Sequence, residues 1–216
     1  MKRKIPTFRS ASSFHSGLKV IIAFATGLSI GFYFFEVPST PVIQSTDHMS
    51  VQACFTPARS CTPLIINAIN NAQKRVYVQA YSFTSAPIAQ ALKQAYRRGV
   101  DVQIIVDKSQ LKQRNSQAKI LAEAQVPLYV DNKVAIAHNK VILIDETTVI
   151  TGSFNFTNAA EKRNAENFVM IENQDLNLQF LQNWLSRRSV SELYSTYLPL
   201  SLHSFKKTFS FKFLLA

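Results

Sequence analysis

Residues 137–145 of this chain read Ala-His-Asn-Lys-Val-Ile-Leu-Ile-Asp, and residues 151–155 read Thr-Gly-Ser-Phe-Asn. The apolar and β-branched run 134–144 predicts a buried strand, in which side chains two positions apart leave the same face. His138 and Lys140 are then expected side by side, with an imidazole and an ammonium at one end of a sheet. An isolated His-x-Lys pair occurs often by chance and is more typical of an exposed strand edge.

The second stretch adds phosphate-binding groups to this pair. Gly152 permits a tight turn that carries Ser153 and Asn155 back toward the same point. Four side chains able to hold a phosphate or to attack it are then expected to converge. The complete spacing, His-x-Lys-x4-Asp-x6-Gly-Ser-x-Asn, is far more specific than the pair alone.

On both sides of this stretch the chain alternates between helical and extended patterns. Helical spacing of apolar residues is found at 64–72, 88–96, 116–124 and 176–188, and apolar extended runs at 76–81, 100–106, 128–130, 147–151 and 168–171. Strands that alternate with helices in the first half predict right-handed crossovers and a sheet covered on both faces. The strand-rich second half predicts a mixed sheet. The predicted fold class is therefore α/β, and a chain of 216 residues is long enough for one domain with a well-buried core.

The ends of the chain differ in composition from its middle. The net charge is +11, but the middle of the chain, 36–198, holds 16 basic and 13 acidic residues, so net charge alone does not indicate nucleic acid. A basic stretch precedes the uncharged run 20–35, whose length lies between a signal peptide (about 7–15 residues) and a membrane span (about 17–25). We predict an exported protein, secreted or periplasmic, with cleavage or retention of this segment left open.

Four parts of the chain follow from these boundaries: residues 1–36 as a signal peptide or anchor, 37–52 as a polar linker, 53–188 as the catalytic domain and 189–216 as a C-terminal extension. In an exported protein we expect Cys54 and Cys61 to form a disulfide, because a close pair of cysteines in an oxidising compartment usually does so. Two free thiols remain an alternative. A zinc site would need two further ligands, and only His48 lies nearby.

The spacing around His138 resembles the signature of the phospholipase D superfamily, without departures. The resemblance extends from about Cys54 to Arg188. The stretches Tyr-Ser-Phe-Thr (81–84), Arg-Gly-Val-Asp-Val (98–102) and Gly-Ser-Phe-Asn-Phe-Thr (152–157) look like the small bacterial members with one motif, which include Nuc-type endonucleases and short secreted phospholipases D. Cys-Phe-Thr-Pro (54–57) and Lys-Arg-Asn-Ala-Glu-Asn (162–167) look closest to the latter.

The resemblance implies a role for each polar residue of the signature. His138 would attack phosphorus to give a phosphohistidine that water resolves. Lys140 and Asn155 would bind the non-bridging oxygens, with Ser153 as a further donor. Glu166 resembles the orienting carboxylate of the family, which would accept a hydrogen bond from the other ring nitrogen of His138.

Other residues receive structural interpretations. Asp145 belongs to the signature but faces away from His138 on a straight strand, so we expect it to hold the strand end. Tyr81 ends a buried strand and is expected in the core rather than in the substrate cleft. The pair Arg187-Arg188 sits at a predicted helix end, where basic residues favour the helix dipole. His15, His48 and His203 are expected to be exposed bystanders.

The signature occurs once, whereas larger relatives carry it twice because one histidine attacks while another protonates the leaving oxygen. We therefore expect a homodimer with the active site at its two-fold interface. No Asp/Glu cluster has metal-ligand spacing, so neither a metal nor another cofactor is expected. The expected substrate is a phospholipid head group, and the alternative is DNA or RNA cleaved by an exported endonuclease.

The tail supports the lipid interpretation, since Phe205, Phe209, Phe211 and Phe213 interleave with lysines as on a membrane-binding segment. It is equally typical of a disordered extension. A third hypothesis, a binding protein without catalysis, conflicts with the intact set His138, Lys140, Ser153, Asn155 and Glu166.

Overall fold

The computed structural model describes residues 49–197. The predicted targeting segment 1–36, most of the predicted linker and the tail from residue 198 lie outside the described residues. No helix within 49–197 is long and apolar enough to span a bilayer. The elements are β1 (Ser50–Thr56), α2 (Thr62–Asn71), β2 (Arg75–Ala80), α3 (Ala86–Arg97), β3 (Asp101–Asp107), the 3-10 helix η1 (Lys108–Leu111), α4 (Ala118–Glu123), β4 (Leu128–Asp131), β5 (Lys140–Ile144), β6 (Thr148–Gly152), α5 (Asn158–Lys162), β7 (Glu166–Glu172), α6 (Gln174–Val190), β8 (Glu192–Leu193) and the 3-10 helix η2 (Tyr194–Tyr197).

All eight strands form one sheet in the order β1-β7-β6-β5-β2-β3-β4-β8. The pairs β2/β3 and β3/β4 are parallel, and each is connected through a helix. The remaining pairs are antiparallel. The mixed sheet predicted from the strand-helix alternation is thereby confirmed.

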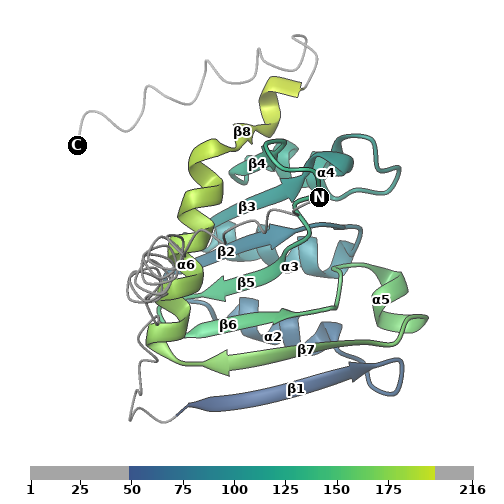
Figure 1. Ribbon diagram of the computed structural model, residues 1–216, viewed down its shortest axis with the longest axis vertical. Coiled ribbons are helices and arrows are strands. Elements are labelled where there is room, and N and C mark those ends of the chain that lie inside the picture. The colour runs from purple at the N-terminus through teal and green to yellow at the C-terminus, as the bar shows by residue number, and fades with distance from the viewer. Residues whose placement is uncertain (1–48, 198–216) are drawn as a thin grey trace, which may run out of the picture. The chain divides into compact units, whose positions relative to one another are not determined.

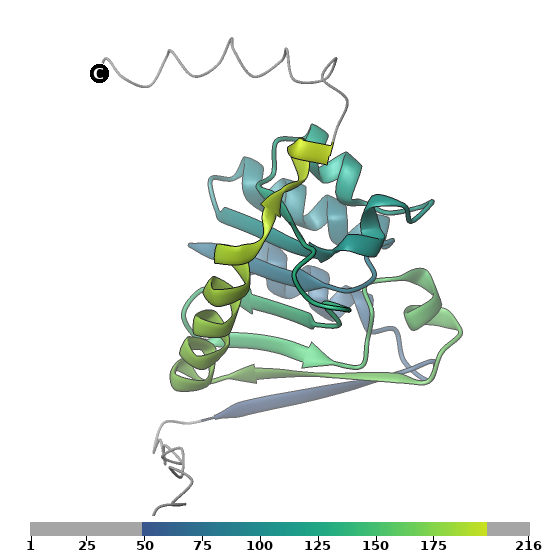
Figure 2. The ribbon, with the colours of Figure 1, turned by 45° about the horizontal axis from the view of Figure 1, so that its top comes forward.

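Alternating side chains send the two faces of the sheet into different cores. On β5, Ile142 joins the large core beneath α2, α3 and α4, whereas Leu143 joins a smaller core with Trp184 of α6. Helix α6 crosses in front of the strands while α2 and α3 lie behind them (Figure 1), and the turned view separates the same two layers (Figure 2). Helices therefore cover both faces, as predicted.

Regular structure extends past the predicted limits of the domain at both ends. Strand β1 begins at Ser50, inside the predicted linker, because its backbone pairs with β7 although residues 50–53 are exposed and partly polar. At the other end, residues 189–197 belong to the domain and not to a separate extension. Glu192 and Leu193 pair with β4, and Tyr194 is buried against the large core.

Two local predictions around the signature also need correction. The strand expected at 134–144 is shorter, since β5 begins only at Lys140 and residues 132–139 form an irregular loop, here called the His138 loop. Gly152 has no left-handed backbone angle. It is required by close approach: a Cβ there would lie 2.4 Å from the carbonyl oxygen of Asn167 in β7.

Candidate active site

The candidate site lies at one end of the neighbouring strands β2, β5, β6 and β7. The register pairs Ala80 at the end of β2 with Lys140 at the start of β5, and Gly152 at the end of β6 with Phe168 near the start of β7. The sheet thus brings together chain segments that are far apart in sequence. Polar residues just beyond these strand ends supply the functional groups.

His138 and Lys140 are in direct contact. His138 precedes β5 and is exposed, while Lys140 is the first residue of β5 and is 7% exposed. Nζ of Lys140 lies 3.2 Å from Nδ1 and 3.3 Å from Nε2 of His138, and it donates a 2.9 Å hydrogen bond to the His138 carbonyl. The pair therefore meets because the ammonium folds back onto the loop, and not because both residues share one strand face as predicted.

Tyr81 completes this side of the site, contrary to its predicted place in the core. Its N–H donates to the carbonyl of Asn139, which continues the β2/β5 pairing past the end of both strands. Its half-buried ring centroid lies 4.4 Å from that of His138, and Nζ of Lys140 lies 5.2 Å from the same ring. The aromatic ring thus forms a wall beside the imidazole.

Ser153 and Glu166 form a second polar group. The Ser153 hydroxyl donates a 2.6 Å hydrogen bond to Oε2 of Glu166 and accepts one from the N–H of Asn167. Asn164 donates to the other carboxylate oxygen at 2.9 Å. No hydrogen bond joins His138 to Glu166 among residues 49–197, where the carboxylate accepts from Ser153 and Asn164.

The two groups are coupled by charge. Burial lowers the pKa of Lys140 below its ordinary value, and the Glu166 carboxylate opposes that shift. Asn155 adds an unmatched polar group, because its buried Oδ1 has no hydrogen-bond partner among the described residues. A half-turn of that carboxamide would present a donor at the same place.

Asp145 lies at the far end of β5 from Lys140, in a left-handed conformation with φ 50°. Its carboxylate accepts hydrogen bonds from the backbone N–H groups of Gln73, Lys74 and Arg75. This residue of the signature therefore ties β5 to the start of β2, away from the His138–Lys140 pair.

Buried carboxylates that the sequence reading did not single out hold the His138 loop. Asp107 accepts the N–H of Ala137 at 2.8 Å, one residue before His138. Asp131 accepts a two-pronged hydrogen bond from Arg187 at 2.8 and 2.7 Å, so Arg187 does more than favour a helix dipole. Both aspartates directly follow a buried apolar run, and this position in the sequence is the signal that could have identified them.

The comparisons with known proteins agree with this geometry. Residues 65–187 match the family described as "Cardiolipin synthase, PLD-like domain". The chain belongs to the phospholipase D family. The resemblance seen in the sequence is therefore confirmed.

Relatives and solved structures place the chain within this family. Proteins named phospholipase D from Rickettsia felis and Rickettsia conorii are 42% and 48% identical, over 80% and 68% of this chain and 95% and 74% of theirs. The structure of Nuc from Salmonella typhimurium, a phospholipase D family member, is 41% identical over 68% of this chain and 99% of its own, with a TM-score of 0.65. The chain is accordingly a phosphodiester hydrolase of the phospholipase D family.

Proposed function

We propose that this phosphodiesterase hydrolyses phospholipid head groups without a metal, through a phosphohistidine on His138. The observation that carries the proposal is the contact between an exposed imidazole and the ammonium of Lys140, 3.2 Å apart. A nucleophile and a cation at that separation can engage the phosphorus and a non-bridging oxygen of one phosphodiester.

The first step forms a bond between a ring nitrogen of His138 and phosphorus while the bond from phosphorus to the head-group oxygen breaks. That oxygen takes a proton from an acid and leaves as an alcohol. The conjugate base of that acid then takes a proton from water as the water oxygen attacks phosphorus, the nitrogen–phosphorus bond breaks, and a phosphate monoester leaves. Splitting the displacement in this way replaces one difficult step by two easier ones.

Charge on the five-coordinate phosphorus would be stabilised by Lys140 and by the carboxamide of Asn155. Ser153 would add a donor by turning its single hydroxyl proton from Glu166 to the phosphate. Tyr81 would limit the movement of the His138 ring by packing against it.

The leaving oxygen needs an acid to protonate it. Within residues 49–197 of one chain, His138 is the single histidine, so a second histidine must come from elsewhere. We therefore propose a two-fold homodimer in which His138 of one subunit attacks and His138 of the other protonates the leaving group. This also accounts for one copy of the signature.

The lipid substrate is supported by the two Rickettsia relatives that are named phospholipase D. The second candidate is DNA or RNA, favoured by the 41% identity to Nuc, because the sequence also resembles the Nuc-type endonucleases. Both substrates offer a phosphodiester to the same groups. We further propose that the protein is exported, which the Cys54–Cys61 disulfide supports.

The test compares purified protein on phosphatidylcholine, cardiolipin and single-stranded DNA, with and without excess EDTA. Phospholipid cleavage that survives EDTA is expected, with His138→Ala as the inactive control. A substrate labelled at phosphorus, followed by rapid quenching, should leave a base-stable label on the peptide that contains His138, and this label identifies the intermediate. Cleavage of DNA but not of phospholipid would favour the second candidate. Activity that is lost on chelation and restored by one divalent ion would overturn the metal-free mechanism.

A further inference from the structure

The loop from Cys54 to Cys61, here called the disulfide loop, begins beside Glu166. We propose that this loop positions Glu166 for the reaction, so that full turnover requires the oxidised cysteine pair. The proposal rests on the proposed function, in which Glu166 takes part. It follows from three connections between the loop and the segment that leads into β7.

The first connection is the strand register. Strand β1 pairs with β7 so that Cys54 faces Phe168 and Thr56, its last residue, faces Glu166. Because β1 is an edge strand, β7 is its one partner in the sheet. The backbone at Glu166 therefore borders directly on the chain that enters the disulfide loop.

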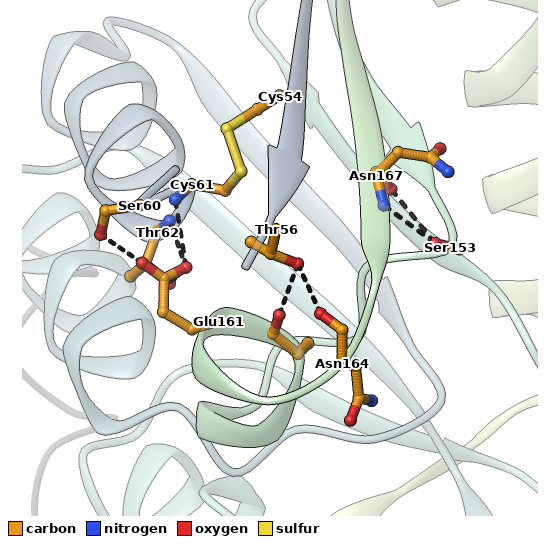
Figure 3. The surroundings of a disulfide bond; sticks show 10 residues. Cys54, Thr56, Ser60, Cys61, Thr62, Ser153, Glu161, Asn164 and Asn167 are labelled. Atoms are coloured by element: carbon orange, nitrogen blue, oxygen red, sulfur yellow. Dashed lines mark hydrogen bonds between the residues drawn. A yellow bond between two sulfur atoms is a disulfide. The ribbon is translucent and has the colours of Figure 1, made fainter. Parts of the chain in front are cut away.

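The second connection runs through a buried hydroxyl. The single hydroxyl proton of Thr56 is shared between two carbonyls, of Ala160 at 2.7 Å from Oγ1 and of Asn164 at 3.2 Å (Figure 3). The side chain of Asn164 in turn donates to Oε1 of Glu166, and Oε2 of Glu166 accepts from Ser153. Asn164 thus connects the loop to Glu166, with its backbone carbonyl bonded to Thr56 and its side chain bonded to the carboxylate.

The third connection fixes the opposite end of the loop. Glu161 of α5 accepts hydrogen bonds from the hydroxyl of Ser60, the N–H of Cys61 at 3.2 Å and the N–H of Thr62 at 2.9 Å (Figure 3). Burial alone would raise the pKa of Glu161, but the hydrogen bonds from Ser60, Thr62 and Cys61 lower it. An ionised carboxylate therefore joins α5, just before the Glu166 segment, to the start of α2.

The disulfide links these two ends. Cys54 and Cys61 are both buried, with Cα atoms 5.8 Å apart, while residues 57–60 between them are exposed. Reduction would let the exposed segment sample many conformations, and the entropy of ordering it would then oppose the bonds of Thr56 and Glu161. A displaced Thr56 releases Asn164, and Asn164 orients Glu166.

Three proteins test this positioning role: the wild type before and after reduction and alkylation, the double variant Cys54→Ala/Cys61→Ala, and Thr56→Val, which keeps the disulfide. Thr148→Val is the matched control, because Thr148 pairs with Glu172 at the other end of the sheet. Rates are measured on a soluble phosphodiester well below each melting temperature. Intact mass after alkylation without reductant establishes the cysteine state.

We expect kcat to fall about tenfold in the double variant, in the reduced protein and in Thr56→Val, with KM changed by less than about threefold. Thr148→Val should stay within about twofold of wild type. In a Glu166→Gln background, the cysteine and Thr56 replacements should cause no further loss, because they act through Glu166. A purely structural role would instead lower kcat by the same factor in both backgrounds.

The outcomes separate the two proposals. If Glu166→Gln lowers turnover but neither the cysteine nor the Thr56 replacement does, the positioning role is wrong and the proposed function stands. If Glu166→Gln leaves turnover unchanged, Glu166 has no part in the reaction. The positioning role is then wrong, and Glu166 is removed from the proposed mechanism. Alkylation of two thiols in unreduced protein would also overturn the positioning role.

Discussion

Nζ of Lys140 lies 3.2 Å from Nδ1 of His138, although Lys140 is buried and His138 is exposed. The buried Lys140 side chain therefore places its ammonium group against the exposed imidazole of His138. Because the lysine gives up water to do this, burial lowers its pKa from the ordinary value of 10.5, against the opposing charge of Glu166. This relationship has a direct consequence for the pH dependence of the rate.

Activity should fall as pH rises through the lowered pKa of Lys140, so the basic limb of kcat/KM should lie below pH 10.5. Between the folded-state pKa and 10.5 the unfolded chain binds more protons, so the contribution of Lys140 to stability rises with pH in that window. Unfolding of this origin therefore cannot cause the loss. Lys140→Arg keeps a charge at every pH and should lose the limb. A limb that persists unchanged in that variant would assign it to another group.

Glu166→Gln should lower kcat by roughly 100-fold and leave KM within about threefold, because the carboxylate anchors Ser153 and balances Lys140 in the transition state. Initial rates over a range of substrate concentrations provide both constants. Glu172→Gln is the matched control, at the exposed far end of the same strand. Equal effects of the two substitutions would remove any special role for Glu166.

Tyr81→Leu should lower kcat by about tenfold, because it removes the ring that packs against His138, whereas Tyr81→Phe should stay within about twofold of wild type. Tyr96→Leu, another half-buried tyrosine, controls for general loss of packing. Steady-state kinetics and melting curves of the three variants decide the matter. A large loss in Tyr81→Phe would show that the hydroxyl, and not the ring, is what the reaction uses.

A shared active site predicts the activity of mixed dimers. If each dimer needs His138 from both subunits, equal mixing of wild type and His138→Ala with full exchange leaves about a quarter of the dimers active by random pairing. The activity per total protein should then be about a quarter of the wild-type value. Native mass spectrometry of a tagged variant verifies exchange. With exchange established, a value near one half would indicate independent subunits and an acid within one chain.

The sequence alone was enough to predict the family and the layered α/β fold. The spacing from His138 to Asn155 identified the family, and the alternation of apolar runs predicted a mixed sheet with helices on both faces. Both signals are local, because side chains on one strand or one helix repeat at fixed intervals whatever the rest of the chain does. The later comparisons agreed with them.

Only the tertiary structure decided how these residues meet. Tyr81 lies beside His138 because β2 and β5 pair in one particular register, and Glu166 contacts Ser153 because β6 lies next to β7. Strand β1 starts within a polar stretch because pairing with β7, and not hydrophobicity, holds its backbone. Such contacts depend on which distant strands become neighbours, and side-chain periodicity within one segment carries no information about that choice.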